Sequence, residues 1–320
     1  MTETLFLSSG DVAGLATPAE YVDAVREGYR QRGEGAPAEP RTALYNDDPP
    51  GLFTSYAAIL PDTGVMGGYM YAAGFGEGDA WFMTPLFDAD SGEPLALVDG
   101  ASMNPFKTGA TGAVGVIGSG AQARGQLRAA ATVRDVETVW VYSPTKSSRE
   151  AFAGEMDRHL DASVAAVSSS AAAVEGADVV ITATNAADPV FDGDSLEPGT
   201  HVTAMGQYHP EKHELDARTV ERSTYVVDLR DRLTQDAGSY MHAVESGAVD
   251  EDHCHAELGE VVAGVADGRT DGEEITVFDS GGTGIETTAA AALVYEKARA
   301  EGLGNEIEFA RASDALTGRE

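Results

Sequence analysis

Three small residues with a fixed spacing are the first feature of the sequence that points to chemistry. Gly118, Gly120 and Ala123 fill the small positions of a G-x-G-x-x-G/A pattern. Gly118 permits a tight turn, Gly120 lets the backbone approach a pyrophosphate, and Ala123 lets a helix pack closely on its strand. Ala121 and Gln122 would begin this helix, whose free N–H groups favour phosphate. Because an apolar run precedes the pattern and a helical face follows it, we interpret it as a dinucleotide site; the alternative is a structural turn.

The end of the next β-like run, VWVY, bears on the choice of coenzyme. NAD sites usually carry Asp or Glu there to bind the ribose 2′-hydroxyl, whereas this chain continues with Ser143, Thr145 and Lys146, and then Arg149. Hydroxyls and cations suit a 2′-phosphate, which a carboxylate would repel. NADP is therefore the expected cofactor, and NAD the second choice. A helix N-cap followed by solvated basic residues would give the same pattern.

Other polar residues follow later strand-like runs. Thr184 and Asn185 end one run, where dinucleotide-binding proteins often line the nicotinamide ribose, and Gly206 ends the next. The glycines at 280–284 could form a second phosphate nest. Glu286 could orient substrate or cap the last helix, and we favour the cap.

His253, Cys254 and His255 are adjacent and suggest a metal site at first sight. Adjacent ligands point in different directions on any regular element, so we predict no metal. Cys254 is the single cysteine, which excludes an internal disulfide.

These residues must be positioned by elements of two kinds. A helix over 18–30 and strands with Gly/Pro/Asp turns, including a hairpin at 88–94, predict an antiparallel N-terminal block. A strong helix over 285–302 could pack back on that block. Between them, alternating strands and helices predict a parallel sheet with helices on both faces. The N-terminal strands are expected at 52–59, 66–71 and 81–87, and the parallel ones at 113–117, 138–142, 163–167, 179–184, 201–205 and 224–228.

Charge and hydropathy limit the possible partners and location. Acidic residues number 53 against 21 basic ones, for a net charge of −32, which would repel nucleic acid. Salt shortens the screening length to ~3 Å at 1 M and relieves self-repulsion, so we expect a salt-adapted protein; a basic partner is the alternative. No apolar run is long enough to span a membrane and the N-terminus does not read as a secretory signal, so we expect a cytoplasmic protein without a membrane partner.

Five segments together resemble the ornithine cyclodeaminase/mu-crystallin family, in order and over most of the chain: LFDADSGEPLALVDG, VGVIGSGAQARGQL, ADVVITATNAADPVF, LEPGTHVTAMGQYHPEKHEL and ITVFDSGGTGIE. The resemblance implies a nicotinamide coenzyme and a homodimer. It also implies the fold class α/β, with a Rossmann doubly wound sheet at 113–280 inserted into a discontinuous α+β substrate and dimerisation domain, 1–112 plus 281–320. Members include ornithine cyclodeaminase, an archaeal type of alanine dehydrogenase, and ketimine or pyrroline-carboxylate reductases.

The resemblance also implies catalytic positions. Arg41 matches the first of two arginines that hold the substrate carboxylate, whereas Lys107 replaces the second and provides a charge without the bidentate fork. Tyr69 replaces the family's lysine and can donate a hydrogen bond without carrying a charge. Tyr208 replaces the catalytic aspartate of the cyclodeaminases, which disfavours ornithine cyclisation because tyrosine has a pKa of about 10. His209 beside it is a candidate proton donor.

One departure affects the join between the domains. Only TGATG lies between Lys107 and Ala113, where the family has a helix, so we expect an altered angle between the domains and a lower rate. The function expected is an NAD(P)H-dependent imine reductase or amino-acid dehydrogenase for a small 2-imino or 2-oxo acid. The alternatives are an ornithine cyclodeaminase with bound NAD and a non-catalytic NADPH-binding protein.

Overall fold

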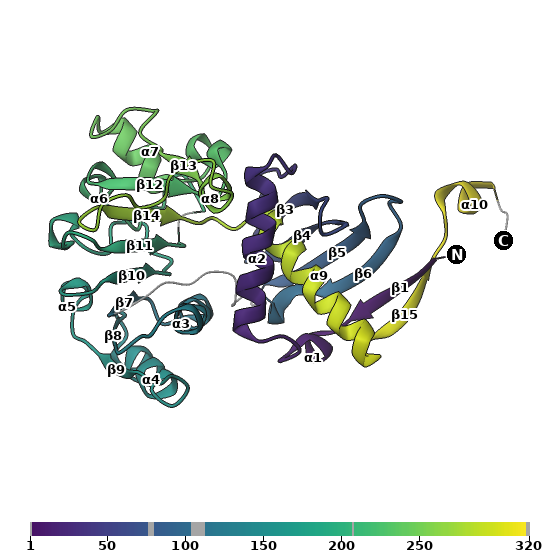
Figure 1. The fold of residues 1–320 in the computed structure, drawn as a ribbon, viewed down its shortest axis with the longest axis horizontal. Coiled ribbons are helices and arrows are strands. Elements are labelled where there is room, and N and C mark those ends of the chain that lie inside the picture. Colours follow the sequence, from purple (N-terminus) through teal and green to yellow (C-terminus); the bar gives the residue numbers. More distant parts are fainter. Residues whose placement is uncertain (1, 76–79, 104–112, 207, 318–320) are drawn as a thin grey trace. The chain divides into compact units, whose positions relative to one another are not determined.

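The computed structural model describes residues 2–75, 80–103, 113–206 and 208–317 (Figure 1). The chain divides into two compact units. Met1–Asn104 and Thr283–Glu320 form the first, called here the discontinuous unit, and Pro105–Gly282 forms the second, called the parallel-sheet unit. The predicted short segment between Lys107 and Ala113 lies outside the described residues.

A seven-stranded mixed sheet forms the framework of the discontinuous unit. Its order is β15-β1-β6-β5-β4-β3-β2, in which β1 and β6 are parallel and all other neighbours are antiparallel. The strands predicted for the N-terminal block are confirmed as β3, β4 and β5. In sheet order the seven strands span Asn305–Phe309, Thr2–Leu7, Pro94–Asp99, Trp81–Asp88, Val65–Ala73, Pro50–Leu60 and Thr42–Asp47.

Two long helices of this unit, α2 (Pro18–Gly33) and α9 (Gly284–Glu301), lie side by side (Figure 1). α9 packs on β3, β4 and β5 and thereby covers one face of the sheet. Each helix begins with a capping box, which satisfies N–H groups that have no partner within the helix. Both predicted helices are confirmed. The shorter helices of the unit are α1 (Ser9–Val12), η1 (Gly100–Ser102) and α10 (Ala312–Thr317).

The parallel-sheet unit contains eight strands in the order β13-β12-β14-β11-β10-β7-β8-β9, every neighbouring pair parallel. From β9 through β8, β7 and β10 to β11, this is the 3-2-1-4-5 order of a dinucleotide-binding fold. The predicted Rossmann sheet is thus confirmed. In sheet order the strands span Ala256–Glu257, Ser223–Val227, Ile275–Asp279, His201–Ala204, Val179–Thr182, Val114–Ile117, Thr138–Tyr142 and Ser163–Ala166.

Helices cover both faces of this sheet, so its central strands are apolar on both sides. Val114 and Val116 belong to the core on one face and Ile117 to the core on the other, and β7 is therefore an unbroken apolar run. The helices are α3 (Ala121–Val133), α4 (Lys146–Met156), α5 (Ser170–Val174), η3 (Gly193–Ser195), α6 (Ala217–Glu221), η4 (Arg230–Thr234), α7 (Gly238–Glu245) and α8 (Leu258–Val262).

Five strands, β1, β2, β13, β14 and β15, were not among those predicted, and β6 was implied only by the hairpin at 88–94. β2 and β15 lie at the two edges of their sheet and expose most of their side chains, so they lack the apolar alternation that indicates a strand. β14 is inserted between β11 and β12, two strands that are consecutive in the sequence and precede it by about 50 residues or more. Within the described ranges, no helix combines the length and apolar character needed to cross a membrane.

Candidate active site

The glycine loop joins β7 to α3 at the carboxyl end of the parallel sheet. Gly118 has a φ of +117°, and a Cβ there would lie 2.3 Å from the carbonyl oxygen of Ala183, so only glycine fits. Gly120 is the N-cap of α3 in an ordinary conformation, and a Cβ there would meet nothing within 4 Å. No side chain caps the helix, which begins at Ala121. Open space before an uncapped helix N-terminus fits a diphosphate group.

The other small residue of the loop pattern serves packing. Ala123 is fully buried in the core between α3 and the sheet, together with Leu127. Gln122 beside it is partly exposed. Ala123 therefore serves the packing of α3 on the sheet, whereas Gly120 leaves open space at the start of the helix.

The loops after β7 and β8 are tied together at their tips. The Ser119 hydroxyl donates to the Ser143 hydroxyl at 3.1 Å. Arg149 donates to the carbonyl oxygen of Ser143 at 2.8 Å, and Arg124 donates to the carbonyl oxygen of Ser119. Two guanidinium groups therefore flank the place where a dinucleotide-binding fold holds the adenosine ribose. Arg124, which the sequence reasoning did not single out, also pairs with Glu155 at 2.9 Å.

The remaining residues of this stretch face solvent. Thr145 is the N-cap of α4, but its side chain makes no capping bond. Lys146 follows with 74% of its side chain exposed and pairs with Glu150 at 3.6 Å. Exposed pairs of this kind contribute little to stability, so Lys146 can turn to a ligand at low cost.

Glu214, which the sequence reasoning did not name as a site residue, joins the ends of β10 and β11. Its fully buried carboxylate accepts the Thr182 hydroxyl at 2.8 Å and the backbone N–H groups of Thr184 and Gly206, each at 2.6 Å. Burial raises the pKa of Glu214, and these hydrogen bonds act in the opposite direction. A Cβ on Gly206 would lie 2.4 Å from the Glu214 carboxyl carbon, which explains the glycine. Thr184 and Gly206, predicted to contact the coenzyme, are thus held by one carboxylate.

Tyr208, Asn185 and Lys212 form a short polar chain beyond the same strand ends. The Tyr208 hydroxyl donates to Asn185 Oδ1 at 3.1 Å, and Lys212 Nζ donates to the Tyr208 oxygen at 3.4 Å. The ammonium also lies 4.7 Å from the centre of the tyrosine ring. His209 accepts the backbone N–H of Glu211 through Nδ1 at 3.2 Å. Lys212, which reasoning from the sequence did not assign to the site, supplies a cation beside Tyr208.

In the discontinuous unit, Arg41 and Tyr69 meet around Tyr56. The Arg41 guanidinium lies 5.7 Å from the centre of the Tyr56 ring, and the Tyr69 ring lies 5.3 Å from the same centre. Tyr69 stacks on Phe82 at 5.2 Å and lies 5.6 Å from Tyr71. Burial raises the pKa of Tyr69 far above its usual value, so the phenol stays neutral and can act as a donor. Lys107, the third residue predicted for this group, lies outside the described residues.

The glycines at 280–284, a candidate phosphate nest, already have an anionic partner. Asp228 accepts the N–H groups of Gly281 and Gly282 at 2.8 and 3.1 Å. Asp228 also pairs with the buried Arg232 at 2.8 Å, which in turn pairs with Asp279 at 3.3 Å. The pKa of Asp279 is raised to about 6, mainly by burial. The Asp228 carboxylate, which accepts the glycine N–H groups, occupies the position that a phosphate would need.

Two further candidates have structural partners. Glu286 completes the capping box of α9 and accepts the Tyr29 hydroxyl at 2.7 Å, which supports the cap. His253 and His255 contact the backbone carbonyls of Val220 and Asp267 respectively. Cys254 is buried between them. The three neighbouring side chains therefore point to separate places.

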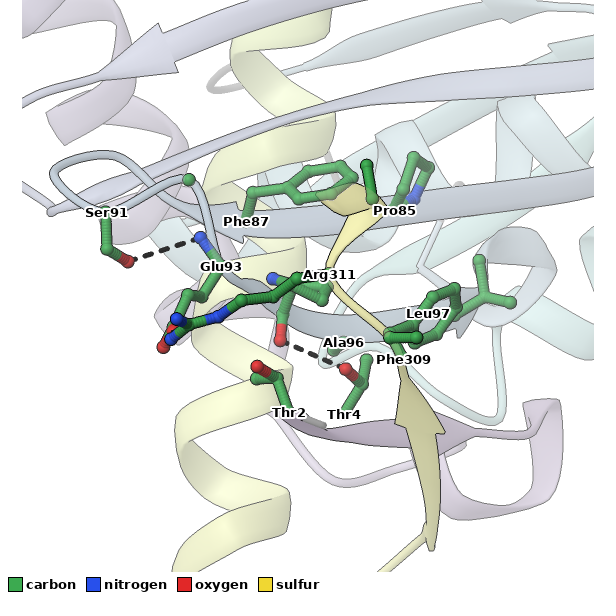
Figure 2. Close-up of a pocket in the computed structure, with 14 residues that line it drawn as sticks. Thr2, Thr4, Pro85, Phe87, Ser91, Glu93, Ala96, Leu97, Phe309 and Arg311 are labelled. Atoms are coloured by element: carbon green, nitrogen blue, oxygen red, sulfur yellow. Dashed lines mark hydrogen bonds and ion pairs between the residues drawn. The ribbon is translucent and has the colours of Figure 1, made fainter. Parts of the chain in front are cut away.

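A cavity of about 740 Å³ opens in the discontinuous unit near the last strand (Figure 2). Pro85, Phe87, Leu97 and Phe309 line it with apolar surface, and Thr4 lies close by with its hydroxyl bonded to a backbone carbonyl. The residues that line this cavity include neither Arg41 nor Tyr69. Its walls are largely apolar, and the two charged residues that line it, Glu93 and Arg311, pair with each other at 3.3 Å.

Comparison with known proteins gives concordant results. The model of the ornithine cyclodeaminase/mu-crystallin family matches residues 2–302. Delta(1)-pyrroline-2-carboxylate reductase from Bacillus cereus is 33% identical over 238 residues, which cover 70% of this chain and 73% of the relative. The structure of the Thermococcus litoralis enzyme of the same name, in complex with NADH and L-proline, has a TM-score of 0.88 at 31% identity and covers 95% of this chain and 100% of that one.

A second solved structure extends the similarity to another activity. An archaeal alanine dehydrogenase dimer with bound NAD has a TM-score of 0.88 at 29% identity, covering 97% of this chain and 100% of that chain. Relatives of this chain thus include oxidoreductases that act on C–N bonds. With a family model matched over nearly its whole length, the chain belongs to the ornithine cyclodeaminase/mu-crystallin family.

Proposed function

We propose that this chain is an NAD(P)H-dependent reductase of C=N bonds next to a carboxylate, acting on a small 2-imino acid or on a 2-oxo acid with ammonia. The observation that carries the proposal is the open, uncapped start of α3 beside Gly120, in a sheet of dinucleotide-binding order. The similarity over 95% of the chain to a reductase in complex with NADH and L-proline supports it.

The chain's own residues divide the work as follows. A reduced nicotinamide, when bound, supplies a hydride to the imine carbon. Arg41 holds the substrate carboxylate by charge-assisted hydrogen bonds, and Lys107 adds a second positive charge. Tyr69 donates a hydrogen bond from the aromatic cluster beside Arg41. Tyr208 and His209 are the candidates for delivering the proton that a neutral imine nitrogen needs.

A steady-state assay tests the reaction. Reduced coenzyme is mixed with pyrroline-2-carboxylate, or with pyruvate and ammonium, in high salt because the net charge is −32. We expect stoichiometric loss of reduced nicotinamide and formation of proline or alanine. Ammonia release from ornithine without net coenzyme consumption would instead identify a cyclodeaminase, and coenzyme binding without either reaction would indicate a binding protein.

NADP is the preferred coenzyme in this proposal. Arg124 on α3 contacts the loop after β7, and Arg149 on α4 contacts the loop after β8. The residues that directly follow β8 are uncharged or basic. We expect NADPH to bind at least about 10-fold more tightly than NADH, because the 2′-phosphate gains a charge-assisted contact. Arg149→Gln should remove most of this preference, whereas Arg158→Gln, in the turn that follows α4, should not. Equal affinities of the unmodified protein for NADPH and NADH would refute the preference.

A homodimer is also part of the proposal. Directly paired residues place Leu44, Phe53, Ala72 and Trp81 in one row across β2, β3, β4 and β5. The side chains of Leu44, Phe53 and Trp81 are 64%, 40% and 78% exposed. Met83, 52% exposed, lies on the same strand and face as Trp81. An exposed apolar face of this extent is typical of a protein interface, and the similar alanine dehydrogenase is a dimer.

The oligomeric state is tested by light scattering with size-exclusion chromatography. The unmodified chain should elute as a dimer, and Trp81→Glu should shift it toward the monomer. Val265→Glu provides the matched control, because Val265 is a 67% exposed apolar residue of the other unit. A monomeric unmodified chain at micromolar concentration would overturn this part.

A further inference from the structure

Glu214 takes part in neither the hydride transfer nor the proton transfer described above. It is fully buried and comes from the loop after β11, yet its carboxylate contacts the ends of both β10 and β11. Its donors are neutral groups: the Thr182 hydroxyl, the backbone N–H groups of Thr184 and Gly206, and also the side chain of Thr184. A buried carboxylate held by neutral groups is costly, so several donors must converge on it to keep it in place.

The position of these donors relates Glu214 to the coenzyme. In open parallel sheets, ligands bind beyond the carboxyl ends of the strands, where the order of the strands reverses. Thr184 and Gly206 lie in the first residues beyond β10 and β11, two central strands. A Cβ on Gly206 would lie 2.5 Å from the carbonyl oxygen of Thr184, so the two loops approach backbone to backbone. The carboxylate of Glu214 bridges their N–H groups.

The backbone of Glu214 is itself fixed from two sides. Its carbonyl oxygen accepts the N–H of Val190 at 2.9 Å, and the next N–H, of Leu215, donates to the Ser239 hydroxyl at 3.0 Å. Hydrogen bonds on both sides of Glu214 therefore hold its backbone, and with it the carboxylate, in a fixed position.

We propose that Glu214 is a positioning residue for the nicotinamide end of the coenzyme, because its carboxylate holds the loops that contain Thr184, Asn185 and Gly206 in the arrangement that receives the nicotinamide ribose. This inference rests on the proposed function, since it assumes that a nicotinamide coenzyme binds at the strand ends. Tyr208 follows Gly206 by two residues and donates a hydrogen bond to Asn185. Glu214 therefore also helps to position Tyr208, the candidate proton donor.

Glu214→Gln is the variant that tests the idea. The amide has nearly the same shape, but its NH2 group must face a donor, so at least one of the two backbone N–H groups loses its acceptor. We expect the Kd for NADPH, measured by fluorescence titration, to rise about 10-fold or more. The KM for the coenzyme should rise with it, while the KM for the imino acid changes by less than about 2-fold.

The chain offers a closely matched control in Asp216, two residues away. Its carboxylate accepts three donors, the N–H of Gly193 at 2.9 Å and the N–H and hydroxyl of Thr219 at 2.8 and 2.7 Å. These groups lie at the start of α6 and in η3, not in the two loops at the strand ends. Asp216→Asn should lower the denaturation midpoint while leaving the Kd for NADPH unchanged. A purely structural role for Glu214 would make the two variants behave alike.

The outcomes separate the inference from the proposed function. If the unmodified protein fails to bind NADPH and NADH, the proposed function fails. If it binds and Glu214→Gln binds equally well, the positioning role is wrong. If that variant does not fold, amide hydrogen exchange of the unmodified protein without coenzyme tests whether Glu214 holds the two loops. The N–H groups of Thr184 and Gly206 should be protected from exchange, and rapid exchange at both would overturn the inference.

Discussion

The two units carry candidate functional residues of different kinds. In the parallel-sheet unit the groups that fit the coenzyme are largely backbone N–H groups at strand and helix ends, held by Gly118, Gly120 and the carboxylate of Glu214. In the discontinuous unit the corresponding groups are the side chains of Arg41 and Tyr69 on one sheet face. Backbone sites depend on conformation and tolerate few changes of shape, whereas side-chain sites can change chemistry without changing the fold.

The residues expected at the site follow the same division. Tyr69, which the resemblance implies in place of a lysine, packs with Tyr56 and Phe82 as an ordinary member of an aromatic cluster. The glycine loop, by contrast, keeps the full spacing of its pattern.

The largest effect is expected for Gly118→Ala. The side chain would be forced to a φ of +117° and to 2.3 Å from a carbonyl oxygen, so the free energy of unfolding should fall by about 3 kcal/mol or more. Gly120→Ala should change it by less than about 0.5 kcal/mol, because its Cβ meets open space, yet the Kd for NADPH should rise about 10-fold. Denaturant titration and coenzyme titration of both variants check this. Similar stability losses in the two variants would contradict the division of roles.

Arg41→Gln tests the side-chain part of the site. Loss of the guanidinium should lower kcat/KM for the imino acid about 100-fold, since a charge-assisted contact to the carboxylate is removed. The Kd for NADPH should stay the same. Arg26→Gln, an exposed arginine paired with Asp23 on α2, is the control and should leave kcat/KM unchanged. If the Arg41 variant instead loses affinity for NADPH, Arg41 serves coenzyme binding and the assignment of it to the substrate is wrong.

Tyr208→Phe asks whether the parallel-sheet unit also supplies a reactive side chain. The variant keeps the ring near Lys212 but removes the hydroxyl that contacts Asn185. If Tyr208 delivers the proton, kcat should fall about 10- to 100-fold with the coenzyme Kd unchanged. An unchanged kcat would leave His209 as the donor, which His209→Gln then tests in the same assay.

The smallest effect concerns the pH dependence of stability. His201 on β11 contacts the hydroxyls of Thr276 and Thr203, and its pKa is lowered from 6.5 to about 4, mainly by burial and then by the nearby Arg269. Between these two values the unfolded chain binds the additional proton, so this histidine makes the protein less stable as the pH falls from 6.5 toward 4.

His201→Gln should remove about 2 kcal/mol of that decline in the free energy of unfolding between neutral and acidic pH. Denaturant titrations at several pH values measure it, with His159→Gln, at an exposed position in the turn after α4, as the control. Equal pH profiles for the His201 variant and the unmodified protein would exclude this contribution.

The sequence was most informative where interactions are local. The glycine loop lies within one strand–turn–helix unit, so its spacing alone indicated both the turn and the helix N-terminus. The last helix was likewise marked by the periodicity before Gly302, which adopts the left-handed conformation that ends α9. The family and the parallel sheet with helices on both faces followed from such local segments, whereas the order of the strands was not predicted.

Contacts between residues that are far apart in the sequence could not be predicted from such local patterns. Glu214 meets partners 32, 30 and 8 positions away, and no local pattern marks a carboxylate that will bridge two strand ends. The aromatic cluster forms because strand pairing sets Tyr56 opposite Tyr69 and Tyr71 opposite Phe82. That register becomes visible only once the order of the sheet is known.

The most direct measurement of the central claim is transfer of an isotope from coenzyme to product. Reduced coenzyme with both hydrogens at C4 of the nicotinamide replaced by deuterium is incubated with pyrroline-2-carboxylate, and the product is analysed by mass spectrometry and NMR. The proposed function predicts proline that carries one deuterium on the carbon next to the carboxylate. Proline formed without deuterium at that carbon, or no proline at all under conditions where the coenzyme binds, would contradict it.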